Sequence, residues 1–227
     1  MFVPLKDENP TVNKPVVTIA LIVINCLVFL YSVMKSTRGF QIFIYQYGLI
    51  PYELIHLTEV TPQFSSPVLL TPFTSMFLHG GWMHLIGNML YLWIFGNNIE
   101  DQLGSVKFVL FYLASGLAAV VLFVVFSPNS EIPLVGASGA IAGVLGAYLY
   151  LFPRARVLTL MWIFYFIRII RLPASVILGF WFVYQLFMSL VSGGGGGVAW
   201  LAHVGGFGFG YAWFRLIIRR RPKMIVL

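Results

Sequence analysis

The chain has 227 residues, of which 59% are apolar and 9% are charged, and its formal net charge is +7. A soluble domain carries about 25% charged residues, so the low charge excludes this class. A disordered chain has high charge and few aromatic residues, and the 17% of aromatic residues here excludes that class too. The composition is typical of a polytopic membrane protein. The single cysteine, Cys26, excludes an intramolecular disulfide and a cysteine-based zinc or iron–sulfur site.

The first apolar run, residues 15–34, contains no charged residue and is long enough to cross a hydrocarbon core of about 30 Å. Its length, and the lack of an obvious small-residue cleavage site, argue against a cleavable signal peptide. Five further apolar runs follow. The six predicted spans are residues 15–34, 82–99, 108–126, 138–152, 173–191 and 200–218. We therefore expect an all-α, six-helix bundle that fills residues 15–218.

The connections between the spans are unequal in length. Residues 35–75 form a long connection with many aromatic residues, which we expect to pack on the outer membrane surface. Residues 157–167 are apolar but short, so we predict an interfacial helix there, with a re-entrant segment as the alternative. The glycine run 193–197 predicts a short, flexible outer loop.

The charges predict the orientation in the membrane. With the N-terminus inside, all of the 14 lysines and arginines except Lys35 and Arg38 fall in inner segments, as the positive-inside rule requires. Both termini are then cytoplasmic, with an N-terminal segment at 1–14 and a basic tail at 219–227. Topology and anionic lipid explain the basic tail, so we expect no nucleic-acid partner.

Polar side chains inside spans indicate function, because they are expensive in lipid. No Asp, Glu, Lys or Arg is expected deep in the bundle, which argues against an ion-driven pump. Ser138 begins the fourth span. The distance along the helix from the inner end of the span is similar, roughly 18 to 22 Å, for Ser138, His84 and His203. Asn97 and Asn98 lie at the inner end of the second span, where they can reach water. The other uncharged polar residues of the spans, hydroxyls aside, are Asn25, His84, Asn88, Gln185 and His203.

The local chemistry around Ser138 favours acyl transfer. Small neighbours, Gly136 and Gly139, leave its hydroxyl accessible, and the start of a helix offers free N–H groups to an oxyanion. Gly206 and Gly210 share a helix face with His203, and a matching glycine face follows Ser138, so the two helices can approach closely. We therefore expect His203 to lie within hydrogen-bond reach of Ser138, as a histidine base beside a serine nucleophile.

His84 and Asn88 lie four residues apart on one helix face, so both can point into the same cavity as oxyanion donors. A single polar residue or glycine motif in a span more often reflects packing or a satisfied interhelical hydrogen bond. We interpret Asn25 and Gln185 as interhelical hydrogen bonds of this kind. His79 is expected to organise the loop before the second span. The joint occurrence at one depth favours a catalytic site.

These elements together resemble the rhomboid family of intramembrane serine proteases over about residues 71–213. Glu100 and Gly104 resemble the family's inner turn after the second span. The residues that carry the resemblance are His79, Gly80, Gly81, Trp82, Met83, His84, Asn88, Gly136, Ala137, Ser138, Gly139, His203, Gly206 and Gly210.

The resemblance implies a Ser138–His203 dyad that cleaves peptide bonds in or beside transmembrane helices of membrane-protein substrates. His84, Asn88 and the backbone N–H of Ser138 would hold the oxyanion. No cofactor or metal is implied, and the sequence indicates no particular oligomeric state. The expected location is a bacterial inner membrane, with the active site open to the outer side.

Two features depart from the family pattern. Bacterial relatives often carry a tyrosine four residues after the serine, stacked on the histidine, and this position is Ala142 here. The Trp-Arg pair that some relatives carry in the first outer loop is also missing. The alternatives are an inactive relative that escorts transmembrane helices, which usually lacks the serine or the histidine, and a small-solute channel or transporter.

Overall fold

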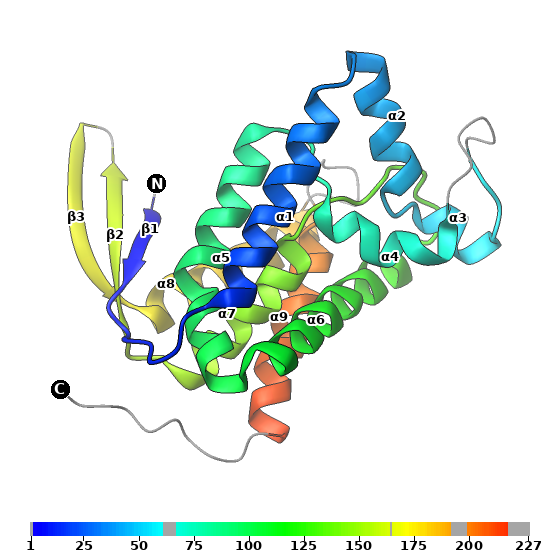
Figure 1. Ribbon diagram of the computed structural model, residues 1–227. Helices are drawn as coiled ribbons and strands as arrows, with labels where there is room; N and C mark the ends of the chain where they lie inside the picture. The colour runs from blue at the N-terminus through cyan, green and yellow to red at the C-terminus, as the bar shows by residue number, and fades with distance from the viewer. Residues whose placement is uncertain (1, 61–66, 164, 192–198, 218–227) are drawn as a thin grey trace.

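The structure, a computed structural model, describes residues 2–60, 67–163, 165–191 and 199–217 (Figure 1). The predicted glycine loop at 193–197 and the basic tail at 219–227 lie outside these residues. Within the described residues, the long helices are α1 (Val16–Val33), α5 (Trp82–Leu103), α6 (Ser105–Phe126), α7 (Ser138–Leu151), α8 (Ala174–Val191) and α9 (Trp200–Leu216).

These helices begin and end within a few residues of the predicted spans, because charged residues, glycines and prolines limit the apolar runs. Among the described residues, three of them, α1, α6 and α8, are long and apolar enough to cross a membrane. Helix α7 has 14 residues, a length of roughly 21 Å, which is shorter than the hydrocarbon core.

Helix α7 is the centre of the bundle and lies among α5, α6, α8 and α9 (Figure 1). Most of its side chains are buried. A side chain at Gly210 of α9 would overlap the carbonyl group of Gly143 on α7. The two backbones therefore touch along their glycine faces, as small residues allow between helices in lipid.

The connection predicted to lie on the outer surface is largely helical. It begins with α2 (Thr37–Tyr47) and α3 (Pro51–His56), and the short helices η1 (Val68–Leu70), α4 (Thr71–Thr74) and η2 (Ser75–Phe77) complete it. Leu49 pairs with Leu134 in an isolated β-bridge, which ties this connection to the loop before α7.

The described residues are mostly helical, as predicted, but they also contain three strands, so the all-α prediction holds only in part. The helix predicted at 157–167 was wrong. Strands β2 (Arg156–Ile163) and β3 (Phe166–Pro173) form an antiparallel hairpin, and β1 (Phe2–Asp7) pairs with β2. The hairpin is rich in β-branched residues, which favour a pleated surface. The short sheet, in the order β1-β2-β3, stands beside the helices (Figure 1).

A buried carboxylate ties the sheet to the bundle. Oδ2 of Asp7 accepts hydrogen bonds from the Tyr148 hydroxyl at 2.8 Å and from Nδ2 of Asn98 at 2.7 Å. Burial raises the pKa of Asp7, and the hydrogen bonds from Tyr148 and Asn98 offset only part of that effect. Strand β1 is thereby held at the ends of α5 and α7.

A second carboxylate fixes the start of α1. Glu100 of α5 accepts the backbone N–H groups of Val17 and Thr18 at 2.9 and 2.8 Å, together with the hydroxyl groups of Thr18 and Ser105. The first N–H groups of a helix have no partner within the helix. Glu100 therefore caps α1 from a neighbouring helix.

Candidate active site

The loop before α7 sets the position of Ser138. Gly136 has φ +126°, and its N–H donates to the carbonyl oxygen of Ser75 at 2.9 Å. A Cβ atom at Gly136 would lie 2.7 Å from Nε2 of His84 and 3.5 Å from Oγ of Ser138. Backbone conformation and space therefore both require glycine here, and Ser138 follows as the first residue of α7.

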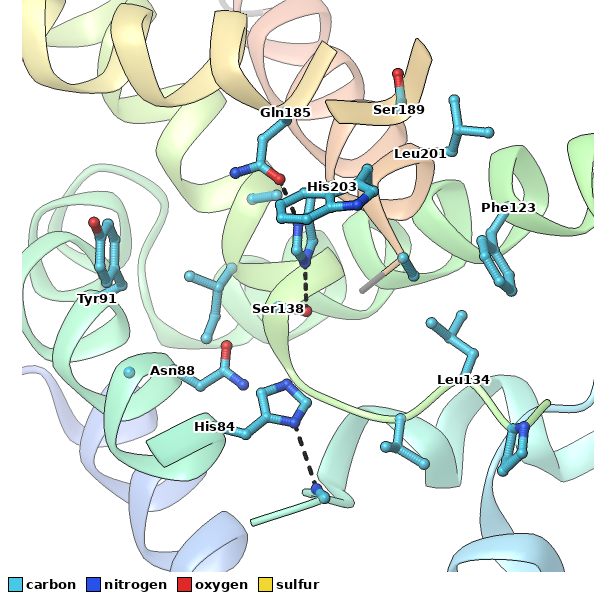
Figure 2. Close-up of a pocket in the computed structure, with 18 of the residues that line it drawn as sticks. His84, Asn88, Tyr91, Phe123, Leu134, Ser138, Gln185, Ser189, Leu201 and His203 are labelled. Atoms are coloured by element: carbon cyan, nitrogen blue, oxygen red, sulfur yellow. Dashed lines mark hydrogen bonds between the residues drawn. The ribbon is translucent and has the colours of Figure 1, made fainter. Parts of the chain in front are cut away.

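The Ser138 and His203 side chains, which are 65 residues apart in the sequence, meet in the bundle. The distance from Ser138 Oγ to His203 Nε2 is 2.8 Å (Figure 2). The glycine faces make this contact possible, because a side chain at Gly206 of α9 would overlap the carbonyl oxygen of Gly139 on α7. Helices α7 and α9 thus present the Ser138 and His203 side chains toward the same space.

Two residues of α8 also contact the His203 ring. Nδ1 lies 2.8 Å from Oε1 of Gln185 (Figure 2). The centroid of the Trp181 ring lies 5.8 Å from that of the His203 ring, at an interplanar angle of 38°. The interhelical hydrogen bond expected of Gln185 is present, and its partner is His203. The same expectation for Asn25 was wrong, because its Nδ2 donates to the Leu21 carbonyl of its own helix.

His84 and Asn88 of α5 lie on the opposite side of Ser138 from α8 (Figure 2). The Gly80 N–H donates to Nδ1 of His84 at 3.4 Å, a long hydrogen bond that leaves the proton of the neutral ring on Nε2, the nitrogen that faces Gly136. Among the described residues, no partner accepts a hydrogen bond from the buried Nδ2 of Asn88. Two donors are therefore available beside Ser138.

His79 lies directly behind His84, in the loop before α5. Its ring is 1% exposed and meets the His84 ring edge to face at 5.2 Å. Burial, followed by the nearby His84, lowers the pKa of His79 from 6.5 to about 4. His79 is thus a neutral, buried side chain that packs against His84.

Ser138, His203, His84, Asn88 and Gln185 all line one cavity of about 970 Å³. Most of the other residues that line it are apolar, and they come from the long helices α5 to α9 and from the loop before α7. Within the described part of the chain, no group of three or more His, Cys, Asp or Glu side chains could hold a metal ion. The site combines a hydroxyl, a base and nearby donors in largely apolar surroundings, which suits acyl transfer.

The sequence pointed to Ser138, His203, His84 and Asn88 as one group, and the structure brings these four side chains to one cavity. The sequence identifies Gln185 as a polar residue in a span but does not connect it with His203. It does not identify Trp181. The only signal for Trp181 was an aromatic residue one turn before Gln185, which is common in apolar helices.

Comparison with known proteins identifies related chains. The Rhomboid domain family matches residues 67–220. The chain is 49% identical over 82 residues to "Rhomboid protease GluP" of Bacillus subtilis, covering 36% of this chain and 15% of that protein. It is 34% identical over 144 residues to "Rhomboid protein 1, mitochondrial" of Saccharomyces cerevisiae, covering 61% and 37% of the two chains.

A third relative is "RHOMBOID-like protein 6, mitochondrial" of Arabidopsis thaliana, 43% identical over 76 residues, which are 34% of this chain and 24% of that protein. The chain thus spans well under half the length of these curated relatives. The matches come from bacteria and from organelles, and the family match covers the segment from η1 through α9 that holds the site.

Proposed function

The chain belongs to the rhomboid family, and on this premise we propose that it is an intramembrane serine protease. It hydrolyses peptide bonds in or beside the transmembrane helices of membrane-protein substrates. Family membership and the three long apolar helices indicate an integral membrane protein. The observation that carries the proposal is the 2.8 Å separation between Ser138 Oγ and His203 Nε2 inside an apolar bundle.

Ser138 is the nucleophile and His203 is the general base. His203 Nε2 takes the hydroxyl proton as Oγ attacks the substrate carbonyl carbon, and it then gives this proton to the leaving amine. An acyl-enzyme on Ser138 remains. His203 next takes a proton from water, the hydroxide attacks the ester carbonyl, and the returning proton restores the Ser138 hydroxyl.

The negative charge that develops on the carbonyl oxygen needs hydrogen-bond donors. We assign these to Nε2–H of His84, Nδ2–H of Asn88 and the backbone N–H of Ser138. The unpartnered Nδ2 of Asn88 supports this assignment, because a donor already bonded to protein would have to give up its partner to serve the oxyanion. Low-dielectric surroundings strengthen each of these hydrogen bonds.

In the proposed membrane topology, all six long helices cross the bilayer and both termini are cytoplasmic. The cavity opens to the outer side of a bacterial inner membrane. The segment 1–14 and the tail 219–227 then lie inside, as the positive-inside pattern supports. A substrate helix must unwind locally at the cavity, because a helical peptide bond is shielded from attack.

Fluorophosphonate labelling together with cleavage of a model transmembrane substrate in liposomes tests this function. The parent protein should be labelled and active, whereas Ser138→Ala and His203→Ala should abolish both without loss of folding. Ser189→Ala is the matched control, since that serine lines the same cavity but donates to the Leu186 carbonyl of its own helix. Full cleavage by Ser138→Ala would refute the proposal.

His84→Ala and Asn88→Ala test the oxyanion assignment. Each should lower kcat by on the order of 10²-fold, as the loss of one oxyanion donor does. Fluorophosphonate labelling of Ser138 should persist in both variants at a reduced rate. Parental kcat in the double variant would remove these two residues from the mechanism.

A further inference from the structure

The His203 ring has a hydrogen-bond partner on both sides. Nε2 faces Oγ of Ser138 and Nδ1 faces Oε1 of Gln185, each at 2.8 Å (Figure 2). The Gln185 side chain is 4% exposed. A buried amide therefore occupies the position behind the base in which serine hydrolases of other folds carry a carboxylate.

We infer that Gln185 is a positioning residue that fixes the tautomer of His203, an inference that rests on the proposed function. A neutral imidazole carries one proton. When Nδ1–H donates to Oε1 of Gln185, Nε2 is left with a free lone pair directed at the Ser138 hydroxyl. The opposite tautomer would point an N–H at Ser138 and could not accept its proton.

Gln185 also serves the protonated state of His203. Once Nε2 has taken the serine proton, both ring nitrogens carry hydrogens, and Oε1 still accepts from Nδ1–H. A carboxylate would stabilise this imidazolium more strongly, but an ionised group inside a membrane bundle is expensive. A neutral amide gives orientation without a buried charge.

Helix α8 thereby supplies two of the contacts that hold the base. Trp181, one turn before Gln185, packs against the His203 ring at 5.8 Å. Ala142, where relatives often place a stacking tyrosine, is fully buried on α7, and its small side chain leaves this role open. In this chain the orientation of the base comes from α8 and not from the helix that carries the nucleophile.

Variants of Gln185 in the liposome assay test the inference. Gln185→Leu should lower kcat roughly three- to tenfold with little change in KM, the effect of one net hydrogen bond. The acidic limb of its pH–rate profile should move to lower pH, because the imidazolium has lost an acceptor. Gln185→Glu should move that limb to higher pH and restore kcat, at a pH where its carboxyl group is ionised.

Val183→Ala on the same helix is the matched control. Val183 is 61% exposed and does not line the cavity, so this variant should keep the parental kcat and pH profile. A structural role for Gln185 alone would lower the amount of folded enzyme without moving the pH profile. Parental kcat and an unshifted profile in Gln185→Leu would therefore overturn the inference.

Nitrogen-15 NMR of the histidine-labelled parent gives a readout that needs no turnover. The His203 resonances, identified by their loss in His203→Ala, should be those of a ring protonated at Nδ1. A ring protonated at Nε2 would overturn the inference, whatever the variants do. Cleavage that survives Ser138→Ala would instead overturn the proposed function, and the NMR result would still decide the hydrogen bond.

Discussion

Replacing Gly206 by alanine tests whether the glycine faces set the geometry of the proposed Ser138–His203 dyad. The new methyl group would overlap the carbonyl oxygen of Gly139 and lie 3.0 Å from its carbon atom. Because non-bonded carbons prefer about 3.5 to 4.0 Å, α7 and α9 must separate by at least about 0.5 to 1 Å. Gly139 follows Ser138 directly, and Gly206 lies one turn after His203. Separating the helices at these glycines therefore also lengthens the distance between the Ser138 and His203 side chains.

The size of the effect follows from the distances. A separation of that size lengthens the contact between Ser138 Oγ and His203 Nε2 from 2.8 Å to about 3.3 to 3.8 Å, near or beyond the limit of a useful hydrogen bond. Since a misplacement of about 1 Å can cost 10²-fold in rate, we expect Gly206→Ala to lose roughly that factor in kcat. Overpacking should also lower the free energy of unfolding by about 1 to 3 kcal/mol.

The control is Gly208→Ala on the same helix, where an added Cβ meets nothing within 4 Å. Alanine is the better helix former by roughly 1 kcal/mol, so this variant should keep its activity and its stability. Cleavage rates in liposomes and unfolding in mild detergent measure both variants. Parental rate and stability in Gly206→Ala would refute the argument that close backbone contact holds the dyad together.

Three further predictions concern stability. The pKa of His79 is lowered to about 4 in the folded protein, so below pH 6.5 the unfolded chain takes up a proton that the folded protein does not. The free energy of unfolding of the parent, relative to that of His79→Gln, should therefore fall by roughly 3 kcal/mol between pH 6.5 and 4. Denaturant titrations at several pH values measure this difference. The raised pKa of Asp7 has the opposite effect, because stability present below pH 3.8 is lost as the pH rises through the folded-state pKa. The free energy of unfolding of Asp7→Asn, relative to that of the parent, should therefore increase with rising pH. A relative free energy that decreases with pH would contradict the burial argument. Glu100→Ala leaves the N–H groups at the start of α1 without their acceptor and should lower the free energy of unfolding by on the order of 3 kcal/mol, while Glu100→Gln, which keeps an acceptor oxygen, should lose much less.

The sheet shows where prediction from sequence stopped. Residues 157–167 read as an apolar segment too short to span, and such a segment is compatible with a helix or a strand. Strand β2 pairs along its length with β3, the next strand in the chain, and also with β1, more than 150 residues earlier, which supplies Val3 opposite Leu160. Periodicity alone does not separate a short apolar strand from a helix, and the pairing with β1 is not a local property of the sequence.

The sequence alone determined the positions of the long helices, because charged side chains are excluded from hydrocarbon and therefore mark where each apolar run ends. It also indicated Ser138, His203, His84 and Asn88, since polar groups are rare in such runs. Only the tertiary structure decided that Gln185 and Trp181 of α8 face His203 and that β1 joins the hairpin. The face that one helix turns toward another depends on how all the side chains pack together, and no single segment carries that information.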